Sequence, residues 1–342
     1  MRKNCRSSSV LEISTPARIH IDLVDMSGRL SRINGSVGFA IEYPRCHLRI
    51  AAASELEIVG IEPDEHSYIR RELEYAASKL GLQDTNFRLE VLSSIPRHAG
   101  LGSGTQWQLA LLALLGRFCD KEIPMKETAR YSTRGRTSGI GVHSFHSGGF
   151  IVDGGRRIES SRPAFKPSSF ADPGDLPPLL FHCAFPSSWG VVVFIPADFR
   201  GLSGEEERSF MECNTPIASE EVAQVCHALL METMPAISEA DLDSFCNSIT
   251  RLQNVGWKAK HWARSDLAGL KQVAECLTRL GIRGVGLSST GPTLFGFYCK
   301  TKFPNREEVR SKLVDGLRSV ARGDLHLTDG ANHGADLITL AH

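Results

Sequence analysis

Residues 95–106 read I-P-R-H-A-G-L-G-S-G-T-Q and lead directly into the apolar run 107–118. Gly100, Gly102 and Gly104 lie within five positions of one another, and glycine lets a backbone approach a ligand closely because it has no side chain. The run that follows contains no proline and consists mostly of good helix formers. This pattern predicts a loop that opens a helix and directs unpaired N–H groups at one point, as phosphate sites do. The alternative is a tight turn before a buried helix.

The composition describes an ordinary globular chain. Its 342 residues are 42% hydrophobic and 23% charged, which is enough for two domains of typical size. Lysine plus arginine equals aspartate plus glutamate at 39 each, so no net field favours nucleic acid or an anionic membrane. No apolar stretch reaches the roughly 18 residues of a membrane span, and nine dispersed cysteines fit a reduced compartment. We therefore expect a cytoplasmic protein without nucleic-acid or membrane partners.

Strand and helix signals are mixed along the chain without regular alternation. Polar and apolar residues alternate from Arg18 onward, which predicts a half-buried strand, and Asn34-Gly35 predicts a hairpin turn. The further strands expected from the pattern are 38–42, 46–51, 87–92, 149–153, 189–196 and 325–327. The helices expected are 63–80, the apolar run after the glycine loop, a short one after Pro124, another near 141–145, three that begin near Ser219, Ser238 and Ser265, and 306–320. Such a mixture favours an α+β fold over a doubly wound sheet.

Four segments follow from these signals. Residues 1–10 are expected to be a disordered leader, and 11–165 a β-rich N-terminal domain that contains the glycine loop. A proline- and serine-rich stretch begins after residue 155, and its part 166–188 is expected to be the linker between domains. The C-terminal domain then covers 189–342.

Three ordered motifs resemble the GHMP kinase superfamily. They are P-A-R-I at 16–19, P-x-x-x-G-L-G-S at 96–103 and G-x-G-x-S-x-x-G-P-T at 284–293. Longer similarities, over 15–35, 98–106 and 134–155, resemble one non-kinase branch, the β-ribofuranosylaminobenzene 5′-phosphate synthases of methanopterin biosynthesis. The resemblance implies a two-domain GHMP-type fold: an N-terminal β-rich domain with a buried phosphate-loop helix, and a ferredoxin-like C-terminal α/β sandwich.

The glycine loop departs from the kinase pattern in ways that matter for its ligand. Kinases of the superfamily usually carry a second serine where this chain has Gly104, and that serine serves the Mg–nucleotide. The loop also lacks the lysine with which a Walker A loop meets the outer phosphates. These departures favour a ribosyl diphosphate over a nucleotide. The diphosphate-binding residues expected are Gly100, Leu101, Gly102, Ser103, Gly104, Thr105 and Gln106.

The resemblance implies that 5-phosphoribosyl 1-diphosphate joins 4-aminobenzoate or 4-hydroxybenzoate, with release of diphosphate and CO2. Such a reaction needs a negative group near the ribose carbon and a cation for the benzoate carboxylate, for which arginine is well suited. We predict Asp25 and Arg32 in these two roles, since a bend at Ser27-Gly28 brings them together, with Asp22 as a third catalytic residue. The alternative is an exposed ion pair, worth about 0–1 kcal/mol.

Further polar residues are candidates for substrate binding. Arg134 and Arg136 suit the ribose 5-phosphate, although surface arginines beside a loop are common. His143 and His146 suit a proton shuttle or a metal pair, and Asp153 suits Mg2+ binding or a turn. The substrate-binding residues expected are Arg18, His20, Arg134, Arg136, Ser138, His143, Ser288 and Ser289, with Asp153 as the metal ligand.

The reaction implies Mg2+ on the diphosphate and no organic cofactor, and the family suggests a homodimer. Two other functions fit the same motifs. One is an ATP-dependent small-molecule kinase of this superfamily, and the other is a catalytically silent ligand-binding regulator.

Overall fold

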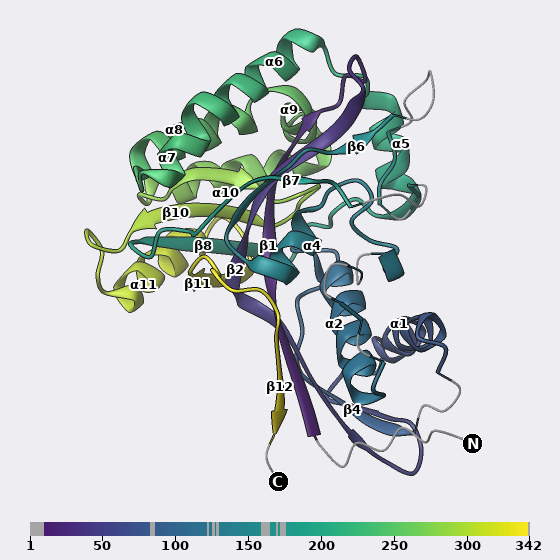
Figure 1. Ribbon diagram of the computed structural model, residues 1–342. Coiled ribbons are helices and arrows are strands. Elements are labelled where there is room, and N and C mark those ends of the chain that lie inside the picture. The colour runs from purple at the N-terminus through teal and green to yellow at the C-terminus, as the bar shows by residue number, and fades with distance from the viewer. Residues whose placement is uncertain are drawn as a thin grey trace.

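A computed structural model describes residues 10–82, 86–121, 123–124, 127, 130–158, 165–168, 170–171 and 176–340. Two long antiparallel strands, β1 (Val10–Asp25) and β2 (Arg32–Ala52), run the length of the molecule (Figure 1). The predicted leader 1–10 lies outside the described residues except for Val10, which opens β1. The helix expected after Pro124 also falls largely outside them.

The larger sheet contains eight of the described strands in the order β12-β1-β2-β4-β3, with β5 and β6 also paired to β2 and β7 paired to β5. Its other strands are β3 (Glu57–Val59), β4 (Phe87–Ser93), β5 (Phe150–Asp153), β6 (Arg156–Arg157), β7 (Leu179–Cys183) and β12 (Asp336–Leu340). The helices on this half are α1 (His66–Lys79), α2 (Ser103–Phe118) and α4 (Ile140–Ser147). Thus β7 forms from a stretch where the sequence predicts a linker, and β12 returns from the far end of the chain.

The smaller sheet has the antiparallel order β11-β8-β10-β9. Its strands are β8 (Trp189–Pro196), β9 (Arg283–Leu287), β10 (Leu294–Cys299) and β11 (Gly323–Thr328). The helices of this half are α5 (Gly204–Asn214), α6 (Ser219–Ala228), a π-helical turn (Leu229–Thr233), α7 (Met234–Ser238), α8 (Leu242–Gln253), α9 (Gly256–Trp262), a 3-10 turn (Ser265–Leu267), α10 (Ala268–Arg279) and α11 (Arg306–Leu317). This strand order and its β-α-β-β-α-β connection are those of a ferredoxin-like unit, which confirms the α+β two-domain prediction.

Local signals gave some elements correctly and others not. The expected strand 189–196 matches β8, and the buried helix after the glycine loop is α2. The hairpin turn at Asn34-Gly35 is wrong, because both residues lie inside β2, where Asn34 pairs with Asp25. The two strands expected after that turn are one continuous strand. Ser238 ends α7 rather than starting a helix, and the cap of α8 is Asp241, whose carboxylate accepts N–H groups of the first turn.

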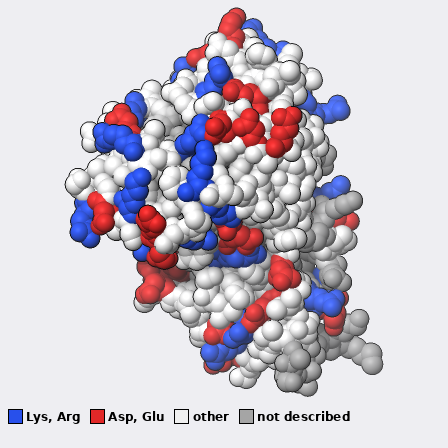
Figure 2. Space-filling model, turned by 90° about the vertical axis from the view of Figure 1, so that its left-hand side faces the viewer, with Lys and Arg blue, Asp and Glu red and all other residues white. Residues whose placement is uncertain are grey.

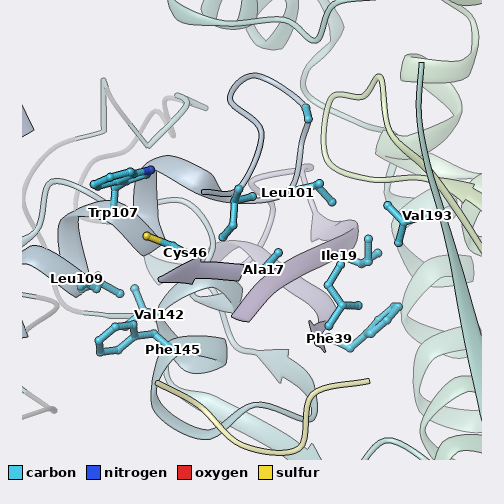
Figure 3. Close-up of a cluster of buried hydrophobic side chains, with 14 of the residues drawn as sticks. Ala17, Ile19, Phe39, Cys46, Leu101, Trp107, Leu109, Val142, Phe145 and Val193 are labelled. Atoms are coloured by element: carbon cyan, nitrogen blue, oxygen red, sulfur yellow. The ribbon is translucent and has the colours of Figure 1, made fainter. Parts of the chain in front are cut away.

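The core of the N-terminal half packs between the sheet and its helices. Figure 3 shows Leu109 of α2 beside Val142 of α4 on one side, and Ile19 and Phe39 of the sheet on the other side, toward Val193 of β8. These residues are fully buried, and α2 is apolar on nearly every side, as a helix enclosed by protein must be. The start of α2 is therefore held firmly in place.

Aromatic rings join the two halves into one core. Phe185 stacks on Phe39 of β2 at 4.8 Å between centroids, and Phe245 of α8 lies 5.2 Å from Phe297 of β10. Phe185 also contacts Phe245 and Phe297. The interface between the sheets is thus a packed aromatic cluster. The face of the molecule drawn in Figure 2 carries basic and acidic side chains interspersed.

We expect Phe245→Ala to lower the free energy of unfolding by about 3–5 kcal/mol, because the variant leaves a cavity where four other rings now pack. Phe303→Ala is the matched control, since its ring is 45% exposed. Urea unfolding measured for both variants checks the expectation. Equal losses in the free energy of unfolding of the two variants would contradict a contribution of the aromatic cluster to stability.

Candidate active site

A cavity of about 400 Å³ lies between the glycine loop, β1, α5, α9 and the turn 288–291. Many of the residues predicted from the sequence line it. They are Arg18, His20, Gly100, Gly102, Ser103, Gly104, Thr105, Arg134, Ser138 and Ser289. The cavity therefore brings together three segments that are far apart in the sequence, one from each of the three motifs.

The glycine loop is held by hydrogen bonds to its carbonyl groups. The Gly100 carbonyl accepts from Arg18 Nη1 at 2.6 Å and from Ser288 Oγ at 2.7 Å. Gly100 has a φ of +78°, and a Cβ there would lie 2.5 Å from the Ser288 carbonyl oxygen. Gly102, with a φ of 83°, is the residue before α2. Since the first N–H groups of a helix have no partner within it, the loop presents them to the cavity.

Two arginines pack against the glycines of this loop. A Cβ on Gly102 would lie 3.0 Å from Cγ of Arg18, and one on Gly104 would lie 2.9 Å from Nη2 of Arg134. Burial lowers the pKa of Arg18 to about 10, so its guanidinium stays charged at neutral pH. Arg134 Nε is buried and has no hydrogen-bond partner among the described residues. The glycine at position 104 thus makes room for a guanidinium where kinases of the superfamily carry a serine.

Glu207 of α5 is the carboxylate that lines this cavity among the described residues. Burial raises its pKa to about 7, and the positive charges of Arg18 and Arg134 act in the opposite direction. Glu207 therefore lies within electrostatic reach of both guanidinium groups. The cavity as a whole stays cationic because Arg97, Lys258 and these two arginines all line it.

Asp153 does not line the cavity, and its role as a metal ligand stays a prediction. Its carboxylate accepts hydrogen bonds from the N–H groups of Gly139 and Gly155 and a short one from Ser36 Oγ. Because the one hydroxyl hydrogen of Ser36 goes to Asp153, Ser36 Oγ accepts from Ser138 Oγ at 2.8 Å, and Ser138 Oγ lies 3.1 Å from His20 Nε2. With its oxygens engaged, Asp153 anchors a chain of side chains that ends at His20 on the cavity wall.

Asp25 and Arg32 bond to other groups, and their catalytic roles stay a prediction. Asp25 Oδ1 accepts from the N–H and hydroxyl of Ser27, at 2.8 and 2.7 Å. The Arg32 guanidinium donates to the carbonyls of Gly154 and Gly155, both at 2.6 Å. Neither side chain lines the cavity. Both side chains support loops. They lie near one bend of the chain, but neither faces the cavity.

Other predicted residues lie behind the cavity wall. Ser288 joins the loop to β1 by accepting the His20 N–H, while Leu101 belongs to the core. Gln106 donates to the Gly141 carbonyl, and Arg136 donates to the Ala171 carbonyl. His143 Nε2 lies 2.9 Å from the Pro177 carbonyl oxygen, outside the cavity. Asp22 is fully buried beside Lys258, whose charge acts on it, and it does not line the cavity.

Sequence reasoning missed the helices α5 and α9 and the side chains they contribute. These are Glu207 from α5, with Trp257, Lys258 and His261 from α9. The sequence of α9 reads G-W-K-A-K-H-W, in which a lysine shares a helix face with aromatic residues. A lysine on such an apolar face was the available signal, since lysine is rarely buried without a partner.

Comparisons with known proteins show the family of the chain. Residues 67–149 match the family described as GHMP kinases N terminal domain. The chain is 36% identical over 289 residues to the beta-ribofuranosylphenol 5′-phosphate synthase of Archaeoglobus fulgidus, covering 84% of this chain and 87% of that protein. It is 31% identical over 338 residues to the synthase of the same name from Methanothermobacter thermautotrophicus, covering 96% and 98%. The homoserine kinase structure from Cytophaga hutchinsonii has the same fold, with a TM-score of 0.65 at 13% identity, covering 96% of this chain and 97% of that one.

We expect Gly104→Ser to leave the melting temperature nearly unchanged, because the new side chain meets only the mobile end of Arg134. Its affinity for inorganic diphosphate should fall about 10- to 100-fold, since one charge-assisted contact is displaced. Gly100→Ala should instead lower the melting temperature, because its Cβ meets two backbone carbonyls. Calorimetric titration and thermal melting separate the two effects. Unchanged diphosphate affinity in Gly104→Ser would refute the role of Arg134.

The raised pKa of Glu207 makes stability depend on pH in a defined direction. A glutamate in the unfolded chain titrates near its ordinary pKa, about 4.3, so the protonated folded form is favoured at low pH. That advantage is lost as the pH rises through about 7.

Glu207→Gln cannot ionise, so it should gain stability relative to the original protein by about 1–3 kcal/mol between pH 5 and pH 8. Urea unfolding at both values measures this, with exposed Glu206→Gln on the same helix as the control. A stability difference that is the same at both pH values would contradict the burial of an ionisable Glu207.

Proposed function

Because the chain belongs to the family of beta-ribofuranosylphenol 5′-phosphate synthases, we propose that it joins 5-phosphoribosyl 1-diphosphate to 4-hydroxybenzoate or 4-aminobenzoate. The bond from the ribose carbon to diphosphate breaks, and a bond from that carbon to the ring forms. The ring carbon then loses its carboxyl group as CO2, and the electron pair of that bond restores the aromatic ring. The product is a C-riboside 5′-phosphate of the methanopterin pathway. The relatives' name describes a phenol, which supports 4-hydroxybenzoate as the acceptor.

One observation carries this proposal: two half-buried arginines, Arg18 and Arg134, pack on the glycine loop at the start of α2. Arg18 and Arg134 add two charges to the N–H groups of the loop, so this end of the cavity suits a diphosphate. Negative charge grows on the diphosphate as it leaves, and these fixed donors stabilise that charge without reorganising. Glu207 takes the place that the sequence assigns to Asp25, since it is the carboxylate that faces the same cavity.

Mg2+ fits this site to a limited extent. Among the described residues, no group of three or more His, Cys, Asp or Glu side chains could hold a metal ion. Mg2+ commonly takes one or two carboxylates and completes its shell with phosphate oxygens and water, so Glu207 and the substrate would hold it. When bound, it would neutralise charge on the diphosphate. We also propose that the protein is a cytoplasmic homodimer. None of the helices within the described residues is long and apolar enough to cross a membrane.

The reaction is tested with carboxyl-labelled 4-hydroxybenzoate, and in parallel with labelled 4-aminobenzoate. Labelled CO2 and diphosphate that appear only when phosphoribosyl diphosphate is also present are the expected result. ADP formation from ATP and an alcohol acceptor would overturn the proposal in favour of a kinase. Ligand binding without any turnover would overturn it in favour of a silent regulator.

We expect Arg134→Ala to lower kcat/KM about 10²- to 10³-fold, because the developing charge on diphosphate loses a fixed donor. Arg136→Ala is the matched control, since its guanidinium donates to the Ala171 carbonyl outside the cavity. Steady-state rates of CO2 release compare the two. Equal losses in both variants would mean that the effect comes from the loop and not from the contact with substrate.

A further inference from the structure

The side of the cavity formed by α9 contains a buried lysine. Lys258 of α9 is 1% exposed, and its ammonium donates to the carbonyls of Leu287 at 3.0 Å and Ser289 at 2.8 Å. A lysine ammonium has three donors. The third makes no hydrogen bond to the described residues, although Lys258 lines the cavity. A buried charge with a free donor is stabilised by an anionic partner, which a ligand in the cavity would supply.

The neighbours of Lys258 leave several polar atoms without partners. His261 is fully buried and neither of its ring nitrogens is hydrogen-bonded, and Nδ1 of His20 is likewise unpartnered. Burial and the nearby positive charges lower the pKa of both histidines well below the usual value, so both rings are neutral at pH 7. Of these three side chains, Lys258 is therefore the cation, and the charge of Arg18 also acts on it. Oδ2 of Asp22, behind the wall, is also unpartnered, and burial raises the pKa of that carboxyl.

The walls around Lys258 are apolar and partly aromatic. Trp257, Met211 and Leu23 line this part of the cavity and are each buried to more than nine-tenths. The ring of Phe210 lies 5.5 Å from that of Trp257 and 4.7 Å from that of His261, so the aromatic side chains hold one another in place. Flat apolar walls beside a buried cation suit a planar aromatic acid.

We propose that this side of the cavity binds the aromatic acid acceptor, with its carboxylate on the Lys258 ammonium and its ring beside Trp257, Met211 and Leu23. This inference rests on the proposed function and replaces Arg32 as the partner of the carboxylate. The diphosphate at the glycine loop and the acid beside α9 then share one cavity. A backbone hydrogen bond joins His20 of β1 to Ser289 of the turn 288–291, and both residues line the cavity wall.

The chemistry makes a specific demand on such a lysine. The carboxylate is charged in the ground state and becomes neutral CO2 as the bond to the ring breaks. Lys258 therefore stabilises the bound acid more than the transition state, and its loss should affect acceptor binding more than turnover.

Two measurements on Lys258→Gln test the inference. The first is KM for 4-hydroxybenzoate, which should rise about 10- to 100-fold while kcat stays within a few-fold or increases. The second is binding of 4-hydroxybenzoate against its neutral amide: the original protein should prefer the acid at least about tenfold, and the variant should lose this preference. Lys260→Gln on the same helix is the matched control, because Lys260 does not line the cavity. Unchanged affinity for inorganic diphosphate shows that the variant is folded.

Acid preference retained by a folded Lys258→Gln variant overturns the inference and leaves the synthase reaction standing. Absence of labelled CO2 from the original protein defeats the proposed function instead, whatever the binding result. If Lys258→Gln does not fold, Trp257→Phe provides the measurement. Binding of 4-hydroxybenzoate should quench tryptophan fluorescence in the original protein and lose most of that quenching in this variant. Equal quenching in both places the acid elsewhere and overturns the inference.

Discussion

The carbonyl of Gly100 holds the site together. It accepts hydrogen bonds from Arg18 on β1 and from Ser288 in the turn between β9 and β10, and the Ser289 N–H donates back to the His20 carbonyl. One backbone group thus joins segments from all three sequence motifs and from both sheets. It belongs to a residue where a Cβ would clash with two carbonyls. Because α2 is buried directly after the loop, packing and these hydrogen bonds hold the loop in one position. The N–H groups at its end are fixed in space before any ligand arrives.

That fixed frame explains how a chain with no net charge presents a cationic cavity. The charges balance over the molecule, and both signs are interspersed on the face in Figure 2. Inside the cavity, however, Arg18, Arg134 and Lys258 face a single carboxylate among the described residues, that of Glu207. Low-dielectric walls strengthen the field of such charges, so a small anionic ligand is attracted without the surface becoming basic. Composition alone could not reveal this, since it averages over the surface.

The sequence predicts local features well and distant associations less well. The glycine loop, α2 and β8 were predicted because each is encoded by its own residues: glycine spacing, helix formers and an apolar run. Asn34-Gly35 carries the local signal of a hairpin turn, and both residues do have positive φ, but β2 runs through them because it pairs with β1 and β5 there. Tertiary pairing overrides turn chemistry at this point.

The same distinction applies to the candidate site. Arg18, His20 and Arg134 were found through motifs, whereas Glu207 and Lys258 come from helices whose exposed and buried faces only the packing defines. Asp25 and Arg32 were assigned by their separation along the chain, and the structure gives each of them backbone partners instead. A short spacing in sequence brings side chains to the same bend without deciding which way they point.

The strand β12 has a further consequence for how this chain assembles. It pairs with the first residues of β1 and forms the edge of the larger sheet, with both ends of the described chain on the same side of the molecule (Figure 1). During synthesis β1 emerges before the ferredoxin-like unit and β12 after it, so the outer edge of β1 stays uncovered while that unit is being made. An uncovered edge is a template for pairing with other chains. The two halves therefore do not assemble independently, because the N-terminal sheet is completed only by residues that follow the C-terminal unit.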